Sequence, residues 1–129
     1  MSQNRKMLKL LSFAQVIVSV IAVVMAFLAA GGPDVQGLVT KIPALAATAL
    51  HALAALLTFA CAFFGIRGAN RPSGIGPHRA LAAAEAVAGA AGVALLGMSA
   101  GGPILPLAVA ALGVAAFVLN VAVVKEADR

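Results

Sequence analysis

The chain has no tryptophan, no tyrosine and only one cysteine among its 129 residues. A single cysteine excludes an intrachain disulfide, a Cys-x-x-Cys redox pair and a thiolate zinc cluster. Charged residues are also scarce, at 10% of the chain against roughly 25% in ordinary soluble domains. Apolar residues dominate instead, at 63% of the chain. This composition excludes a water-soluble globular domain, a disordered tail and a coiled coil.

Patterns that carry enzyme chemistry are also missing from the sequence. It contains no phosphate-binding glycine loop, no paired carboxylates, no Ser/His/Asp set and no His-Glu-x-x-His motif. The glycines of residues 67–77 (RGANRPSGIGP) are typical of turns rather than of a nucleotide-binding loop. We therefore expect a protein that is not an enzyme and has no catalytic site, cofactor or metal.

Four apolar stretches are long enough to cross a membrane, whose hydrocarbon core of about 30 Å requires roughly 20 helical residues. They lie near residues 8–30, 43–65, 79–99 and 104–124. The first exceeds the roughly 7–15 apolar residues of a signal peptide, and no convincing cleavage site follows it. The sequence predicts an all-α membrane protein, a four-transmembrane-helix bundle that forms a single integral membrane domain over residues 1–129.

The segments between the spans indicate how the helices are connected. Glycine and proline occur between the predicted spans, and the sequence AGGP occurs twice, at residues 30–33 and 100–103. Each copy follows an odd-numbered span. The repeat favours an arrangement of two tandem helical hairpins related by an axis along the membrane normal.

Lysine and arginine, which resist translocation, are distributed unevenly. All but Lys41 of the 9 basic residues fall in the two tails (1–7 and 125–129), the middle loop or the adjoining ends of the spans. This bias predicts a multi-pass protein of the plasma (inner) membrane with both termini in the cytoplasm. It also accounts for the net charge of +5, so we infer no nucleic-acid partner.

The first three spans each carry one face of small and polar residues. Small residues allow helices to approach closely in lipid, where no hydrophobic effect drives them together. The residues that we expect to pack the helices are Ser12, Ser19, Gly89 and Gly92. We also expect the third span to mediate self-association or binding to another membrane protein, so that leucine at Gly89 and Gly92 would weaken it.

The helix rise places one polar side chain of each span at a similar depth, about 6–10 Å inside the cytoplasmic edge. These side chains are Gln15, Thr58, Glu85 and Asn120. A carboxylate inside a membrane is costly and is by default a functional hypothesis. Glu85 is therefore interpreted as a packing group bonded to Gln15 or Asn120, as a carrier of protons or cations, or as an incidentally exposed side chain near the cytoplasmic end of its span.

Two further side chains within the spans can titrate. His51 lies deeper than the polar layer, about 20 Å from the cytoplasmic edge, and is expected to be a packing residue. Cys61 is expected to be a small apolar filler in the same span.

In size and number of spans the chain resembles the small multidrug resistance transporters. That family depends on a glutamate in its first helix and on aromatic residues that line the substrate cavity. Here the first span has Gln15, the acid is Glu85 in the third span, and tryptophan and tyrosine are absent. The resemblance is therefore limited to size, and we assign no family from it.

These observations favour a structural or regulatory membrane subunit or a homo-oligomer, without catalytic activity. Its expected partners are the lipid bilayer and either a second copy or another membrane protein. The alternative is a small proton- or cation-coupled transporter or channel that acts as a dimer. Glu85 would then be the ion-handling carboxylate, in a polar site completed by Gln15, Thr58 and Asn120.

Overall fold

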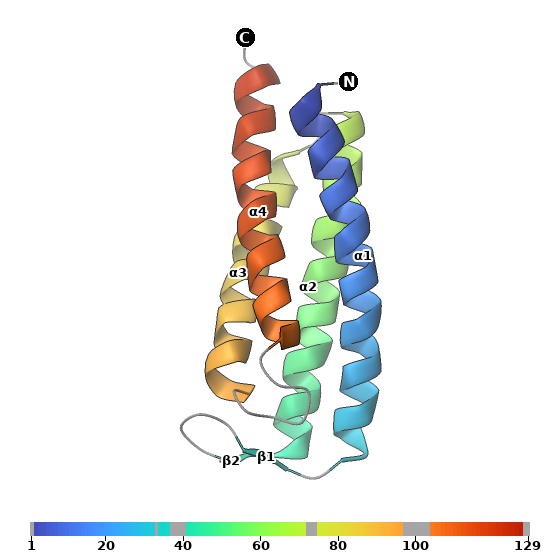
Figure 1. The fold of residues 1–129 in the computed structure, drawn as a ribbon, viewed down its shortest axis with the longest axis vertical. Helices are drawn as coiled ribbons and strands as arrows, with labels where there is room; N and C mark the ends of the chain where they lie inside the picture. The colour runs from blue at the N-terminus through green and yellow to red at the C-terminus, as the bar shows by residue number, and fades with distance from the viewer. Residues whose placement is uncertain (1, 33, 37–40, 72–74, 97–103, 128–129) are drawn as a thin grey trace.

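The computed structural model describes residues 2–32, 34–36, 41–71, 75–96 and 104–127. It contains four helices, α1 (Gln3–Ala30), α2 (Ala44–Asn70), α3 (Gly76–Leu96) and α4 (Ile104–Ala127). Two short strands, β1 (Val35–Gln36) and β2 (Lys41–Ile42), pair antiparallel between α1 and α2. The helices run alternately in opposite directions along one common axis, with both chain termini at the same end (Figure 1).

The helices extend further than the apolar stretches at the end that carries the termini. α1 begins at Gln3 rather than at residue 8, and α2 continues to Asn70 rather than ending at residue 65. The reason is that polar side chains stabilise these turns. Ser2 Oγ accepts a hydrogen bond from the Arg5 backbone N–H at 3.3 Å and so caps α1. At the other end of α3, predicted residues 97–99 lie outside the described part of the chain.

In the described part of the chain, three helices are long and apolar enough to cross a membrane, namely α1, α2 and α4. α3 carries Pro77, His78 and Arg79 in its first turns, and Glu85 follows two turns later. The prediction of four apolar spans is thus supported for three of the helices.

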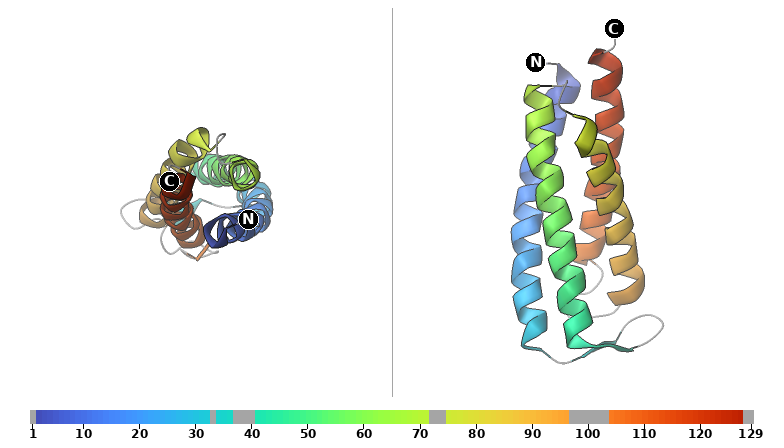
Figure 2. Two further views of the ribbon diagram at one scale, coloured as in Figure 1. Left: turned by 90° about the horizontal axis from the view of Figure 1, so that it is seen from above. Right: turned by 180° about the vertical axis from the view of Figure 1, so that it is seen from behind.

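The four helices associate as two antiparallel pairs. Contacts are most extensive between α1 and α2 and between α3 and α4, and they are fewer between the two pairs. Viewed along the bundle axis, the helices form a ring in which α1 lies diagonally opposite α3 (Figure 2). This pairing is compatible with two tandem hairpins.

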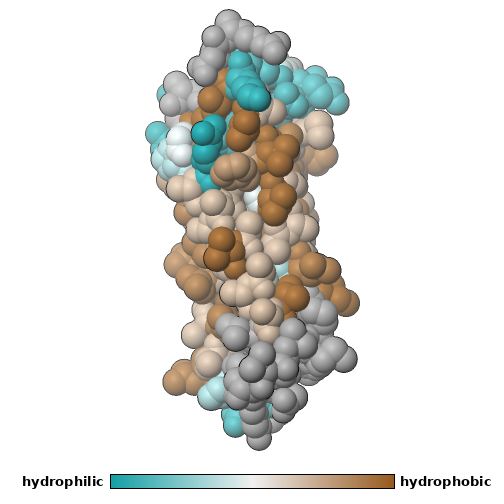
Figure 3. All heavy atoms as spheres, turned by 90° about the vertical axis from the view of Figure 1, so that its left-hand side faces the viewer, coloured by the Kyte–Doolittle hydropathy of each residue, from teal (hydrophilic) through white to brown (hydrophobic). Residues whose placement is uncertain are grey.

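The bundle buries polar side chains among small apolar ones and exposes large apolar side chains on its surface. Among the residues that the structure describes, eight polar or charged side chains are buried: Ser12, Gln15, Ser19, His51, Thr58, His78, Glu85 and Asn120. Large apolar side chains such as Leu10, Ile17 and Phe27 are exposed instead. In Figure 3 apolar residues cover the middle of one face, and hydrophilic residues gather toward the end with the termini. A soluble domain has the opposite distribution, because water favours a polar surface.

Glycines allow the backbones of α3 and α4 to touch. A Cβ atom at Gly89 would overlap the backbone of Ala110, and a Cβ at Gly113 would lie 2.5 Å from the Ala86 nitrogen. A Cβ at Gly92 would lie 2.9 Å from Pro106 Cβ. Gly89 and Gly92 therefore pack α3 against α4 of the same chain. They are buried, so leucine there would disrupt the fold and would not test association between molecules, contrary to our expectation from the sequence.

We expect Gly113→Ala to destabilise the bundle, although alanine is the better helix former. Its methyl group would meet the α3 backbone, and overpacking of this kind typically costs about 1–3 kcal/mol. The measurement is thermal unfolding in detergent micelles, followed by circular dichroism. Gly76→Ala is the matched control, since a Cβ there meets nothing within 4 Å. A Gly113→Ala variant as stable as the parent would show that α3 and α4 do not approach this closely.

Candidate functional site

The centre of the bundle contains a polar contact between two diagonally opposed helices. Gln15 and Glu85 are both fully buried, and Gln15 Nε2 donates a hydrogen bond of 2.6 Å to Glu85 Oε2. The same amide nitrogen lies 3.4 Å from Cys61 Sγ. The contact therefore joins α1 to α3 and also includes α2.

Several oxygen atoms around this contact are left without partners. Within the described residues, Glu85 Oε1, Gln15 Oε1 and Thr58 Oγ1 are buried and make no hydrogen bond. The Thr58 hydroxyl and the Cys61 thiol lie on α2 beside the Glu85 carboxyl group. The Thr58 hydroxyl and the Cys61 thiol can each donate one hydrogen bond at this site, and the Gln15 and Glu85 oxygens can accept.

Asn120 belongs to a second polar cluster, nearer the end that carries the termini. Its Oδ1 accepts a hydrogen bond of 2.9 Å from Arg79 Nε, and its Nδ2 contacts the Ile75 carbonyl oxygen at 3.3 Å and His78 Nδ1 at 3.0 Å. His78 precedes Glu85 by seven residues of helix, about 10 Å along the axis. The expected single layer is thus two clusters. The single layer was expected because the depth of each side chain was counted from the end of its apolar stretch. That count leaves out the turns by which each helix continues beyond the stretch.

The second cluster determines which nitrogen of His78 carries the proton in a neutral ring. Arg79 occupies the Asn120 oxygen, so the Asn120 amide nitrogen faces His78 Nδ1, which must accept. The N–H is then on Nε2, which is buried and unpartnered among the described residues. A Cβ at Gly65 would lie 3.2 Å from His78 Nε2 and would overlap Ser12 Oγ, so this glycine makes room for both groups.

Sequence reasoning did not identify His78 as an interior residue, because it follows the glycine- and arginine-rich loop. The signal that could have found it is its spacing from Glu85. Two turns of helix separate them, and the intervening Ala82 is also buried. All three therefore share one face of α3.

The other predicted residues lie apart from Glu85 or bond within their own helix. His51 is buried beside Gly89, Gly92 and Val109, where α2 meets α3 and α4. The hydroxyl groups of Ser12 and Ser19 donate to the carbonyl oxygens of Leu8 and Val16, at 2.8 and 2.7 Å. These serines pack closely and contribute no hydrogen bond between helices.

Charged side chains hold the helices together at the end that carries the termini. Arg5 Nε and Nη2 donate to the carbonyl oxygens of Ala69 and Asn70 at 2.6 and 2.9 Å. The positive charge of Arg5 also interacts favourably with the C-terminal end of the α2 dipole. Glu126 of α4 accepts hydrogen bonds from Ser2 Oγ at 2.7 Å and Asn4 Nδ2 at 2.6 Å. The start of α1 is thereby tied to the ends of both α2 and α4.

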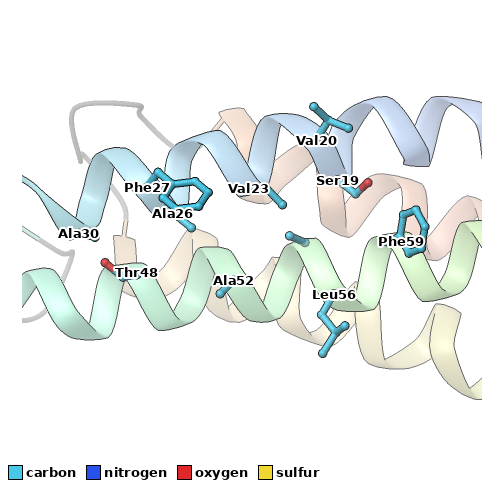
Figure 4. Close-up of a pocket in the computed structure, with 11 residues that line it drawn as sticks. Ser19, Val20, Val23, Ala26, Phe27, Ala30, Thr48, Ala52, Leu56 and Phe59 are labelled. Carbon is cyan, nitrogen blue, oxygen red and sulfur yellow. The ribbon is translucent and has the colours of Figure 1, made fainter.

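Two apolar grooves open on the outer surface of the bundle. One, of about 620 Å³, runs between α1 and α2 with Ala26 and Ala52 among its lining residues and Phe27 and Phe59 along it (Figure 4). The other, of about 550 Å³, lies between α1 and α4 and includes Ala14. Apolar side chains make up nearly all of both linings, so each groove suits an apolar occupant.

Comparison with known proteins gives no relative for this fold and site. No protein-family model matches the chain, and neither a curated protein nor a solved structure is significantly similar to it.

Proposed function

We propose that the chain is a multi-pass protein of the plasma membrane that serves as a structural or regulatory subunit without catalytic activity. The observation that carries this proposal is the distribution of polarity. Buried polar side chains such as Gln15 and Glu85 contact one another inside the bundle, whereas the outer surface is apolar and grooved. Such a surface is compatible with lipid and with the transmembrane helices of a partner.

The charge distribution supports an orientation with both termini in the cytoplasm. Seven basic residues belong to the end that carries the termini, and Lys41 in β2 lies at the opposite end (Figure 1). The seven are Arg5, Lys6, Lys9, Arg67, Arg71, Arg79 and Lys125. An excess of lysine and arginine is typical of the cytoplasmic side of a membrane protein.

The orientation can be tested with single cysteines in a Cys61→Ala background. Arg71→Cys and Gly31→Cys introduce an exposed thiol at opposite ends of the bundle. We expect a membrane-impermeant maleimide to label Arg71→Cys only from the cytoplasmic face and Gly31→Cys only from the external face. The Cys61→Ala chain without an added cysteine is the blank. Labelling of both positions from one side would contradict the proposed crossing.

For the subunit role, we propose that the α1–α2 groove receives an apolar transmembrane helix, from a second copy or from another membrane protein. The groove offers few hydrogen-bond partners, since Ser19 and Thr48 bond to the carbonyl oxygens of Val16 and Ala44 of their own helices. Small residues along it allow a helix backbone to approach closely.

We expect Ala26→Leu and Ala52→Leu to weaken association, because each fills the α1–α2 groove with a larger side chain. A loss of about 1.4 kcal/mol would lower the affinity tenfold. The measurement is the crosslinked fraction in native membranes over a dilution series. Ala14→Leu is the matched control, since it fills the α1–α4 groove instead. Unchanged crosslinking in Ala26→Leu and Ala52→Leu would exclude the α1–α2 groove as the contact surface.

A second candidate function is proton or cation transport by a dimer, with Glu85 as the ion-handling group. The specific observation in its favour is the set of unpartnered oxygens of Gln15, Thr58 and Glu85. Asn120 is not part of this set, because it bonds to Arg79 and His78.

The transport candidate predicts that Glu85→Gln abolishes pH-driven ion flux in proteoliposomes, because an amide cannot exchange a proton or carry a charge. Glu126→Gln is the matched control, since that carboxylate lies at the end of the bundle and bonds to Ser2 and Asn4. Equal flux in the parent and Glu85→Gln chains would rule out an ion-handling role for Glu85.

A further inference from the structure

Most of the unsatisfied polar atoms in the described interior of the bundle lie around Glu85. Among the described residues, the buried side-chain atoms without a hydrogen-bond partner are Gln15 Oε1, Thr58 Oγ1, His78 Nε2 and Glu85 Oε1. Native proteins pair nearly all buried polar groups, so a cluster of exceptions requires an explanation. Two of these atoms belong to one hydrogen-bonded pair of residues, Gln15 and Glu85.

The contact between Gln15 and Glu85 is compatible with a neutral carboxylic acid and a primary amide. Gln15 Nε2 donates to Glu85 Oε2 at 2.6 Å, which leaves the Oε1 atom of each residue unpartnered. If Glu85 is ionised, both Oε1 atoms are acceptors, and the other donors beside the pair are the Thr58 hydroxyl and the Cys61 thiol. A proton on Glu85 Oε1 adds an O–H donor that the unpartnered amide oxygen of Gln15 can accept.

The charges around Glu85 also favour a neutral acid. The groups that face it are Gln15 from α1 and Thr58 and Cys61 from α2. Packing from α4 at this level comes from Gly113 and Ala116, neither of which carries a charge. On α3 itself, the nearest charged or titratable groups in the described residues are Arg79 and His78, six and seven residues before Glu85. A buried carboxylate without a counter-charge is strongly unfavourable.

A metal cation fits the site less well than a proton. Hard cations are held by about six oxygen ligands, and the site offers fewer than that. The Gln15 amide also points its N–H group, which repels a cation, at Glu85 Oε2 and Cys61 Sγ. A proton requires only one carboxylate oxygen to hold it.

We propose that the Glu85–Gln15 pair is a proton-binding site that joins the two helix pairs across the bundle axis. Gln15 belongs to the α1–α2 pair and Glu85 to the α3–α4 pair. Loss of the proton therefore removes an O–H donor between the two pairs, while the amide N–H bond to Glu85 Oε2 remains. This inference rests on the second candidate function in one respect only, namely that a transported ion would be the proton bound at this site. A purely structural bundle would hold the same proton without transport.

Infrared spectroscopy of the full chain in lipid vesicles tests the site, because a protonated carboxyl has a carbonyl stretch that a carboxylate lacks. We expect this band near neutral pH in the parent chain and in Glu126→Gln, and its loss in Glu85→Gln. An ordinary glutamate titrates near pH 4.3, so a band seen only below about that pH would overturn the proposal.

Gln15→Leu supplies a second test that does not require replacement of Glu85. Removing the amide should shift the carbonyl band to the frequency of an acid without a hydrogen bond, while the band persists. An unshifted band would show that Gln15 is not the partner. If Glu85→Gln fails to fold, the pH titration of the parent band and the Gln15→Leu shift still decide.

Three further outcomes distinguish this proposal from a metal-cation site and from transport. Loss of the band on adding sodium or potassium at constant pH would assign the site to a metal cation and overturn the proton. A band at neutral pH with no flux in proteoliposomes would sustain the proton site and reject transport. Glu85-dependent flux without the band would reject the proton site and retain transport.

Discussion

A carboxyl group in the middle of an apolar bundle needs hydrogen-bond partners from inside the bundle, and Glu85 imposes this requirement on the structure. Its contact with Gln15 crosses the ring diagonally, from α3 to α1. Two side chains can span that distance only where the helices approach one another closely. Small residues allow this approach, among them Ala82 and Ala116, which pack beside Cys61 at the level of Glu85. The polar contact and the small-residue packing are therefore mutually dependent.

The two ends of the bundle differ in how they are held. At the end with the termini, Arg5 and Glu126 tie α1 to α2 and α4, and the Asn120 cluster lies just inside. At the other end the described cross-links are few, although Asp34 Oδ1 accepts a hydrogen bond of 3.0 Å from the Ala44 backbone N–H at the start of α2. The outer grooves lie on the apolar sides of the bundle, away from these polar contacts.

The sequence predicted the helices well because long apolar stretches leave little alternative, and it predicted the buried faces because helical spacing is regular. Ser12, Gln15 and Ser19 are buried along one face of α1, as that spacing predicts. Helix ends were less predictable. Charged residues end an apolar stretch, yet a helix continues through them when side chains such as Ser2 and Arg5 satisfy its terminal groups.

By itself, the sequence determined the helical class, the apolar surface and the concentration of basic residues in the tails and the middle loop. Each of these depends on composition and on a period of 3.6 residues, which are local properties. The partner of each polar group was decided only by the tertiary structure. The helical period predicts which residues share a face of a helix. It predicts neither the helix against which that face packs nor the offset of the two helices along the bundle axis. For that reason Gln15 meets Glu85, Asn120 meets His78 instead, and Gly89 and Gly92 pack inside the chain.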